Sequence, residues 1–208
     1  MRFRFYAGRC LPMLLVLAVS SATFGQDAKT VGSSEYFPLA EGTQWEYVTK
    51  SGKIVTQVVK HEEIEGLMCA RIEATLANNK KSSEYVRITK DGIYRIQASD
   101  RTITPPLRFL MLPVKVGATW QVESKTLGLT IKGTFKVSKG TVKVPAGEFQ
   151  DVIICTSDDF MIADKKVPHT YWFAKGVGIV KQVVKFGNQE MVLELEKFTP
   201  GNNVPGKN

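Results

Sequence analysis

Hydrophobic and polar residues alternate along most of this chain with a period of two. Between residues 36 and 198 nearly every segment follows this pattern, and no segment shows the period of an amphipathic helix. A period of two directs one face of a strand into the core and the other into water. The pattern therefore predicts an all-β fold. Its clearest examples are residues 68–76, 131–137 and 191–196.

Turn signals separate the alternating segments. They are Ser51-Gly52, Asp91-Gly92, Lys139-Gly140 and Gly187-Asn188. Short turns between half-buried strands indicate antiparallel pairing, because a parallel crossover needs a dozen or more residues. The spacing of the turns predicts about ten or eleven strands, which is too many for one flat sheet. We therefore expect an antiparallel sheet that curls into a barrel or half-barrel.

A motif of the form apolar-Pro-apolar-x-x-Gly-x-x-Trp-x-apolar occurs twice, at residues 37–47 and 112–122. A second pair of similar segments, 84–95 and 170–181, follows with an offset larger by eleven residues, which predicts a longer middle hairpin in the second half (residues 129–144). The repetition predicts an internal duplication with halves at about 36–98 and 107–198 that share one core. The motif residues are Pro38, Gly42 and Trp45 in the first copy and Pro113, Gly117 and Trp120 in the second.

Each motif residue has a structural interpretation. Proline begins a strand without needing an amide N–H, glycine permits a tight turn, and tryptophan points from the next strand into the core. The alternative for Trp45 and Trp120 is that their rings stack against a sugar or another ligand.

The ends of the chain differ from its middle. Residues 1–25 combine Arg2, Arg4 and Arg9 with an apolar stretch from Leu11 to Val19 and small residues after it, which is the pattern of a secretory signal peptide. Cleavage is expected after Gly25 or Ala22, and the mature protein is expected to be periplasmic or secreted. Residues 26–35 are predicted to be a flexible lead, 36–198 a single β domain and 199–208 a disordered tail.

Charge excludes one class of function. The chain carries 28 basic and 20 acidic residues, a net charge of +8. Removal of the signal segment takes away three arginines and lowers this value to +5. The remaining basic residues are dispersed, whereas nucleic-acid-binding proteins concentrate them on one face. We therefore expect no nucleic-acid partner.

The segments YFPLAEGTQWEY (36–47), LPVKVGATWQV (112–122), VPAGEF (144–149) and YWFAKGVGIVK (171–181) resemble a loose group of exported bacterial β-proteins, most of unknown function. The strand order of this group is similar to the incomplete barrel of periplasmic lipoprotein carriers (LolA/LolB-like). The resemblance implies a curved sheet whose concave face holds an acyl chain or another apolar ligand.

Two groups of residues have open interpretations. Cys69 and Cys155 form a disulfide or remain as two buried free thiols. The apolar run around Leu107, Phe109 and Met111 lines the ligand site, together with Trp45 and Trp120, or is a buried connection between the halves.

Catalytic motifs are lacking in the sequence. His61 lacks the second histidine of a zinc-binding helix, no nucleophile elbow occurs, and no metal or cofactor is expected. The first hypothesis is therefore a non-enzymatic protein that binds an apolar ligand (a lipid or acyl chain) or an envelope partner. The alternatives are a secreted hydrolase that uses His169 with Asp158 and Asp164, and a structural or interaction module.

Overall fold

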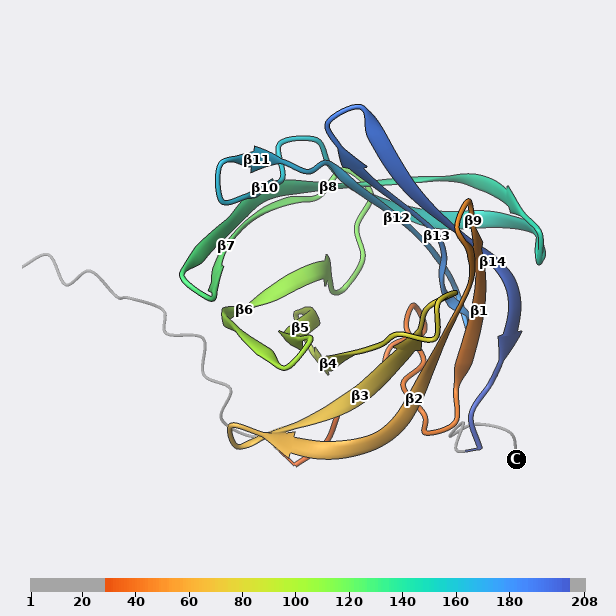
Figure 1. Ribbon diagram of the computed structural model, residues 1–208, viewed down its shortest axis with the longest axis horizontal. Coiled ribbons are helices and arrows are strands. Elements are labelled where there is room, and N and C mark those ends of the chain that lie inside the picture. Colours follow the sequence, from red (N-terminus) through yellow and green to blue (C-terminus); the bar gives the residue numbers. More distant parts are fainter. Residues whose placement is uncertain (1–28, 203–208) are drawn as a thin grey trace, which may run out of the picture.

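The computed structural model describes residues 29–202, which form a closed antiparallel barrel of twelve strands (Figure 1). The described residues contain strands and turns and no helix, so none of their elements is a helix that could cross a membrane. The strands are β1 (Gln44–Thr49), β2 (Gly52–Ile64), β3 (Leu67–Thr75), β4 (Lys81–Thr89), β5 (Gly92–Ala98), β6 (Arg101–Met111), β7 (Thr119–Thr126), β8 (Leu129–Val144), β9 (Gly147–Ser157), β10 (Met161–Ile162), β11 (Lys165–Lys166), β12 (His169–Ala174), β13 (Gly178–Phe186) and β14 (Gln189–Thr199). The predicted all-β antiparallel barrel is confirmed, with one or two more barrel strands than expected.

Sequential strands pair around the barrel, and the contact between the first and the last strand closes it. β1 pairs with β14, and β8 pairs with β9, while the short β10–β11 hairpin pairs with β8 outside the ring. The contact between β6 and β7 is the weakest, with one paired position, Thr104 opposite Lys125. The next two residues of β6 are Pro105 and Pro106, which have no amide N–H to donate to a neighbouring strand.

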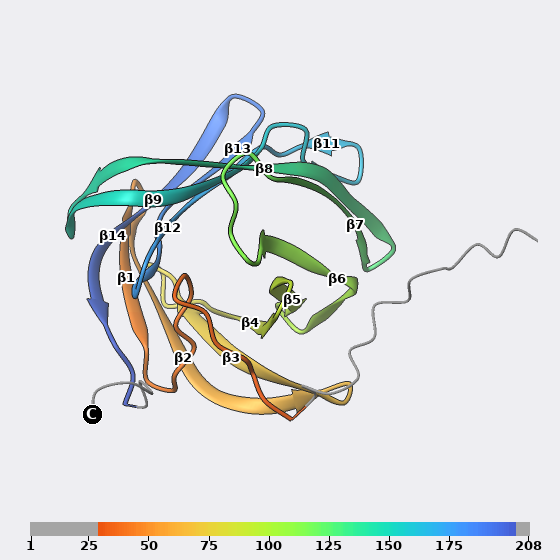
Figure 2. The same ribbon diagram turned by 180° about the vertical axis from the view of Figure 1, so that it is seen from behind.

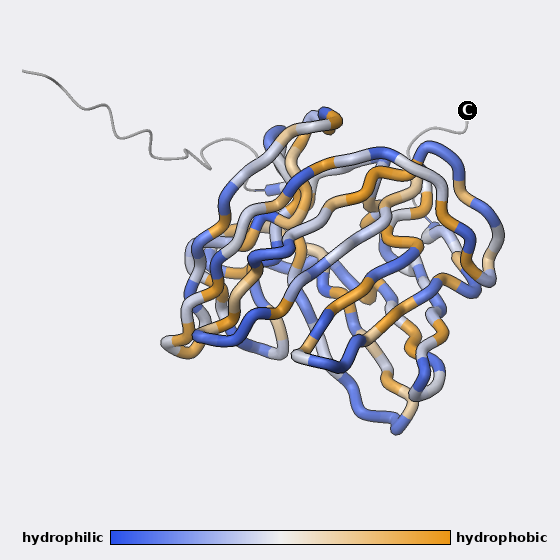
Figure 3. Tube along the Cα trace, turned by 90° about the horizontal axis from the view of Figure 1, so that it is seen from above, coloured by the Kyte–Doolittle hydropathy of each residue, from blue (hydrophilic) through white to orange (hydrophobic). Residues whose placement is uncertain are grey.

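The alternation of the sequence corresponds to the two faces of the barrel wall (Figure 3). In β3 the predicted inward positions Ala70 and Ile72 are buried, and in β8 the same holds for Ile131, Phe135 and Val137. The turn predicted at Lys139-Gly140 is wrong. β8 continues through these residues as one strand of 16 residues, with a bulge between Gly140 and Val142 in its pairing with β9.

One end of the barrel is covered by the N-terminal segment, residues 29–43, which crosses part of the opening in front of β2 and β3 in Figure 2. The amide of Ile88 donates to the carbonyl of Val31 at 2.8 Å, and the amide of Gly176 donates to that of Glu35 at 2.7 Å. Phe37 is buried and stacks on Trp45, with ring centroids 5.5 Å apart. The prediction of a flexible lead is therefore wrong for residues 31–35, whereas residues 26–28 lie outside the described part.

Residues 199–202, predicted as the start of a disordered tail, make defined contacts. β14 includes Thr199, the amide of Gly201 donates to Thr43 Oγ1 at 3.1 Å, and the amide of Asn202 donates to the carbonyl of Glu41. Residues 203–208 and the predicted signal segment 1–25 lie outside the described part of the chain.

The two copies of the sequence motif form turns with matching geometry. Gly42 and Gly117 have φ angles of 85° and 84°, in the left-handed region that favours glycine. The Gly42 amide donates to the carbonyl of Val58 and the Gly117 amide to that of Val137, both at 2.8 Å. The equivalence of these turns agrees with a duplicated unit, and the duplication of the complete halves stays a prediction.

The role predicted for the two prolines is wrong. Pro38 and Pro113 lie in the loops six residues before β1 and β7, and neither begins a strand. The role predicted for the tryptophans agrees with their burial. The indole N–H of Trp45 donates to the carbonyl of Val177 at 2.6 Å and that of Trp120 to the carbonyl of Arg108 at 3.0 Å.

Candidate binding cavity

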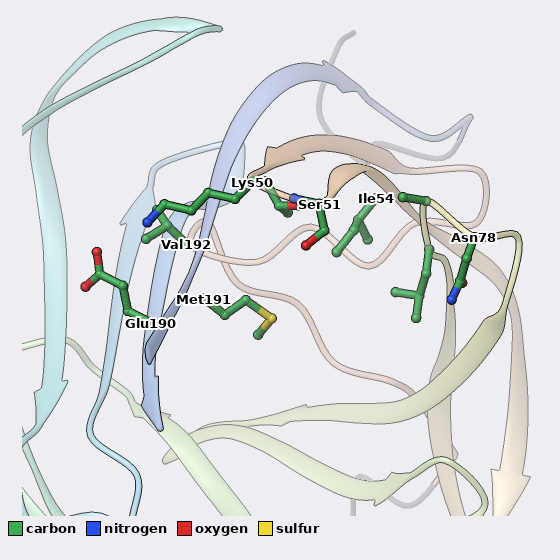
Figure 4. Close-up of a pocket in the computed structure, with 10 residues that line it drawn as sticks. Lys50, Ser51, Ile54, Asn78, Glu190, Met191 and Val192 are labelled. Carbon is green, nitrogen blue, oxygen red and sulfur yellow. Dashed lines mark hydrogen bonds between the residues drawn. The ribbon is translucent and has the colours of Figure 1, made fainter. Parts of the chain in front are cut away.

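The end of the barrel opposite residues 29–43 is formed by the β1–β2, β3–β4, β5–β6, β7–β8 and β13–β14 turns and by the connection from β9 to β12. We call this end the rim. A cavity of about 550 Å³ opens there, between the β1–β2 turn, the β3–β4 turn and the start of β14 (Figure 4). Twelve strands enclose more space than an eight-stranded barrel, which side chains just fill, so unfilled space at the uncovered end has a geometric cause.

Apolar side chains make up most of the cavity wall. Ile54 and Met191 project into the cavity in Figure 4, and Leu76 and Val192 also line it. Ile54 and Leu76 are inward-facing positions of β2 and the end of β3, two residues along from the inward-facing Thr56 and Ala74. Lys50 and Glu190 extend to one side of the cavity, and Asn78 lies on the other (Figure 4). The cavity therefore has an apolar wall and a polar margin.

A smaller cavity of about 190 Å³ adjoins these residues on the inner face of β2 to β5. Thr56 and Ala74 line it, and two positions along a strand correspond to about 7 Å. Its wall includes an ion pair, in which the Nε–H of Arg95 donates to Glu84 at 2.5 Å. The guanidinium also lies 5.2 Å from the centroid of Phe109. Arg95 thus separates this polar cavity from the aromatic core.

The residues predicted to bind the ligand lie in that core. Leu107, Phe109, Trp45 and Trp120 are buried, Met111 is half-buried, and none of the five lines either of the two cavities. Phe109 contacts Phe37 edge-on, with centroids 5.9 Å apart, because residues 29–43 cover this end of the barrel. The prediction of a ligand-lining role is corrected, and the alternative of a buried connection agrees with the structure.

His169 is half-buried on β12 between aromatic rings. Its ring centroid lies 4.7 Å from that of Phe160 and 6.0 Å from that of Tyr171, and its Nδ1 lies 2.7 Å from the carbonyl oxygen of Val167. Burial, together with a smaller effect of the positive charge of Arg95, lowers the pKa of His169 to about 4. In the described part of the chain no hydrogen bond or ion pair joins His169 to a carboxylate. The geometry expected for the hydrolase alternative is therefore not present.

The acidic residues of the hydrolase alternative lie in the connection from β9 to β12. Asp158 and Asp164 are exposed. Asp159 accepts hydrogen bonds from the Thr134 amide at 2.8 Å and from the Ser157 hydroxyl at 3.1 Å, and the first of these lowers its pKa. Asp159 therefore holds the connection against β8. Among the described residues no three His, Cys, Asp or Glu side chains gather closely enough to hold a metal ion.

Both cysteines of the described residues are free thiols. Cys69 packs with Tyr85 and Ile96 in a small cluster on one face of the wall, whereas Cys155 belongs to the main core. Of the two alternatives, the structure has the buried thiols and not the disulfide. Burial raises the pKa of Cys69 to about 11 and raises that of Cys155 as well.

Two solved structures are similar to this chain. One is described as a putative lipoprotein from Parabacteroides distasonis, with 14% identity, a TM-score of 0.52, and coverage of 79% of this chain and 98% of that chain. The other, described as a putative exported protein with a YmcC-like fold from Bacteroides fragilis, has 17% identity, the same coverage and a TM-score of 0.46. The first similarity shows the fold alone. No protein-family model and no curated protein matches the sequence.

The residues around the cavities are ones that sequence reasoning did not select. Leu76 and Met191 belong to the alternating segments, but their places beside a turn did not mark them as cavity residues. The charged residues Glu84 and Arg95 were a stronger sequence signal of a cavity than the positions of Leu76 and Met191, because they occur among inward-facing positions that are otherwise apolar. In β5 the bulge opposite Tyr85 and Val86 adds the extra residue Ile96 and shifts the period of two after Arg95, whereas the alternation of β4 is uninterrupted.

Proposed function

We propose that this protein is an exported, non-enzymatic binding protein that takes an apolar ligand, such as an acyl chain, into the cavity at the rim. The observation that supports this proposal is the cavity of about 550 Å³ with its wall of Ile54, Leu76, Met191 and Val192. Small-molecule sites commonly have volumes of about 300–1,000 Å³, mainly apolar walls and a few polar groups that orient the ligand. The cavity fits this description in size and in lining.

The two cavities together favour an amphipathic ligand. The apolar wall would hold the chain, because removing apolar surface from water is favourable by roughly 25 cal/mol per Å². The polar group of the ligand would lie at one of two places. These are the margin with Lys50 and Glu190, or the deeper cavity where Arg95 and Glu84 supply both donors and acceptors.

A fluorescent fatty acid tests the proposal. Purified protein is titrated into dansylaminoundecanoic acid, and the rise in dansyl emission gives a dissociation constant. Ile54→Trp fills the cavity, and Met191→Arg places a charge on its apolar wall. We expect each substitution to raise the dissociation constant at least tenfold, because the indole takes the volume that the ligand would fill and the arginine replaces apolar wall surface that the chain would cover.

Val116→Trp is the matched control. Val116 is 62% exposed in the loop between β6 and β7 at the covered end, so this substitution adds the same bulk away from the cavity. It should leave the dissociation constant unchanged. The proposal would be wrong if the fatty acid did not bind, or if Val116→Trp weakened binding as much as Ile54→Trp.

The location of the protein and its relation to the lipoprotein carriers belong to the same proposal. The signal pattern of residues 1–25 supports an envelope or secreted location, and the match to a protein described as a lipoprotein agrees with it. The relation to LolA/LolB-like carriers stays a proposal, and it must accommodate a ring closed through the β8–β9 pairing. Because the contacts of His169 favour no reaction, we propose no enzymatic activity.

A further inference from the structure

We propose that the rim of the barrel docks onto an anionic lipid surface. The proposal goes beyond ligand binding and does not depend on it, since it concerns the outside of the turns and not the cavity. It rests on two independent features of the rim, its charge and its exposed apolar side chains.

Charge is distributed unequally between the ends of the barrel. Within two residues of the turns at the rim there are nine cationic and five acidic side chains. At the covered end, the turns with the same margins and the segments 29–43 and 200–202 carry five cationic and six acidic side chains. The cations at the rim are Lys50, Lys53, Lys80, Lys81, Arg101, Lys125, Lys165, Lys166 and Lys185, and the acids are Asp100, Asp158, Asp159, Asp164 and Glu190.

The net charge of the exported chain is therefore concentrated at one end, although the sequence shows it as dispersed. Turns that are far apart in the chain meet at the rim because the strands are antiparallel and every second turn lies at the same end. Each lysine or arginine near a membrane containing anionic lipid contributes about 1 kcal/mol of attraction.

Exposed apolar side chains lie at the same end. Leu127 is 64% exposed, Leu129 46% and Phe186 50%, and Met191, which also lines the cavity, is 41% exposed. They belong to the β7–β8 and β13–β14 hairpins, which lie on either side of the β10–β11 hairpin along one arc of the rim (Figure 1). An isolated exposed apolar residue needs no explanation. Several of them at the tips of nearby hairpins match what inserts at a lipid interface.

Two groups of turns at the rim would make different contacts with the lipid surface. The β1–β2, β3–β4 and β5–β6 turns carry five of the nine cations and one acid, Asp100, so they would lie against anionic headgroups. The arc with Leu127, Leu129 and Phe186 would place its apolar side chains at the boundary between headgroups and acyl chains. The cavity opens between these arcs, so its mouth would face the lipid surface.

Vesicle binding tests this proposal with a matched pair of double variants. Lys185→Gln/Phe186→Ser removes one exposed cation and one exposed apolar side chain from the rim, and Lys115→Gln/Val116→Ser removes the same two kinds of side chain from the covered end. Each protein is sedimented with vesicles of phosphatidylcholine alone or mixed with phosphatidylglycerol. Circular dichroism and the melting temperature establish that each variant is folded.

We expect binding to the mixed vesicles that weakens as salt rises, because screening reduces attraction between exposed charges. The rim variant should bind at least tenfold more weakly, and the Lys115→Gln/Val116→Ser variant should bind as the wild type does. Equal binding to pure phosphatidylcholine, equal losses in both variants, or no vesicle binding would overturn the proposal. The last outcome would indicate a protein partner for the rim.

The cavity variant Ile54→Trp separates this proposal from ligand binding. It should lose the fluorescent fatty acid and keep its binding to vesicles. If it keeps vesicle binding while the wild type binds no fatty acid, the docking surface stands and the proposed ligand function fails. If Ile54→Trp remains folded and loses vesicle binding as well, the rim is not an independent docking surface.

Discussion

The stability of the protein should depend on pH through His169. The ring is half-buried against Phe160 and Tyr171, and burial lowers its pKa from 6.5 to about 4. The unfolded chain therefore binds a proton at a higher pH than the folded protein does. Because proton binding to the unfolded state destabilises the native state, the free energy of unfolding should be highest above pH 6.5 and should fall as the pH decreases towards 4.

The shift gives the magnitude of this effect. One pKa unit corresponds to 1.36 kcal/mol, so a decrease from 6.5 to about 4 corresponds to at most about 3 kcal/mol. The ring retains partial exposure to solvent, which makes this value an upper limit. A loss of 1–3 kcal/mol, on this scale, would be roughly a fifth of the stability of a typical domain.

Urea unfolding at several pH values between 4 and 7 measures the effect. Other groups also titrate in this range, so the informative quantity is the difference between wild type and variants. His169→Phe and His169→Gln both remove the titrating ring, and both should reduce the decrease in stability by the same amount, although their stabilities at pH 7 will differ. Equal pH dependence in wild type and both variants, or an NMR titration of His169 with a pKa near 6.5, would refute the reasoning.

Three further predictions concern the barrel itself. Gly42→Ala and Gly117→Ala should each lower the free energy of unfolding by about 1–2 kcal/mol through the left-handed φ alone, since an added Cβ meets no atom closer than 3.8 Å; unequal losses would contradict the equivalence of the two turns. Cys69 and Cys155 should react with a thiol reagent only after unfolding, and an intact mass two hydrogens lower in the secreted protein would disprove free thiols. β7 shares one paired position with β6, whereas β9 is paired along both of its edges, so the backbone amides of β7 should exchange with deuterium faster than those of β9. Equal protection of the two strands would contradict a weak contact between β6 and β7.

The fold was largely accessible from the sequence because it depends on local signals. The period of two in residues 68–76 and 131–137 reflects the barrel wall directly, and the Gly of each motif marks a turn with positive φ. The turn prediction at Lys139-Gly140 failed because a glycine within a strand can also lie beside a β-bulge, where the strand continues and remains paired. The pairing of residues Lys136 to Val144 of β8 with β9 decides between these two outcomes, and no local pattern contains that information.

The order of the terminal segments could not be predicted from the sequence, for a different reason. Residues 29–35 are mostly polar or small, and they are held by backbone hydrogen bonds, by the buried side chain of Val31 and by the ion pair of Glu35 with Lys175. The carbonyl of Val31 accepts from Ile88, and the carbonyl of Glu35 accepts from Gly176. A backbone group is the same in every residue, so composition does not indicate that it is engaged. The covering of one barrel end could not be foreseen for the same reason.

That covering also decides between the two roles that the sequence left open for the aromatic residues. Aromatic residues such as Trp45 and Phe109 can line a ligand site or fill a core, and sequence alone does not distinguish the two. In this barrel Phe37 from the covering segment occupies the space beside both rings. Removal of that segment would leave Trp45 and Phe109 facing a vacant space at the second end of the barrel. The segment 29–43 therefore determines which end of the barrel is available to a ligand, and the apolar residues near the rim, Ile54 and Met191, have no such cover.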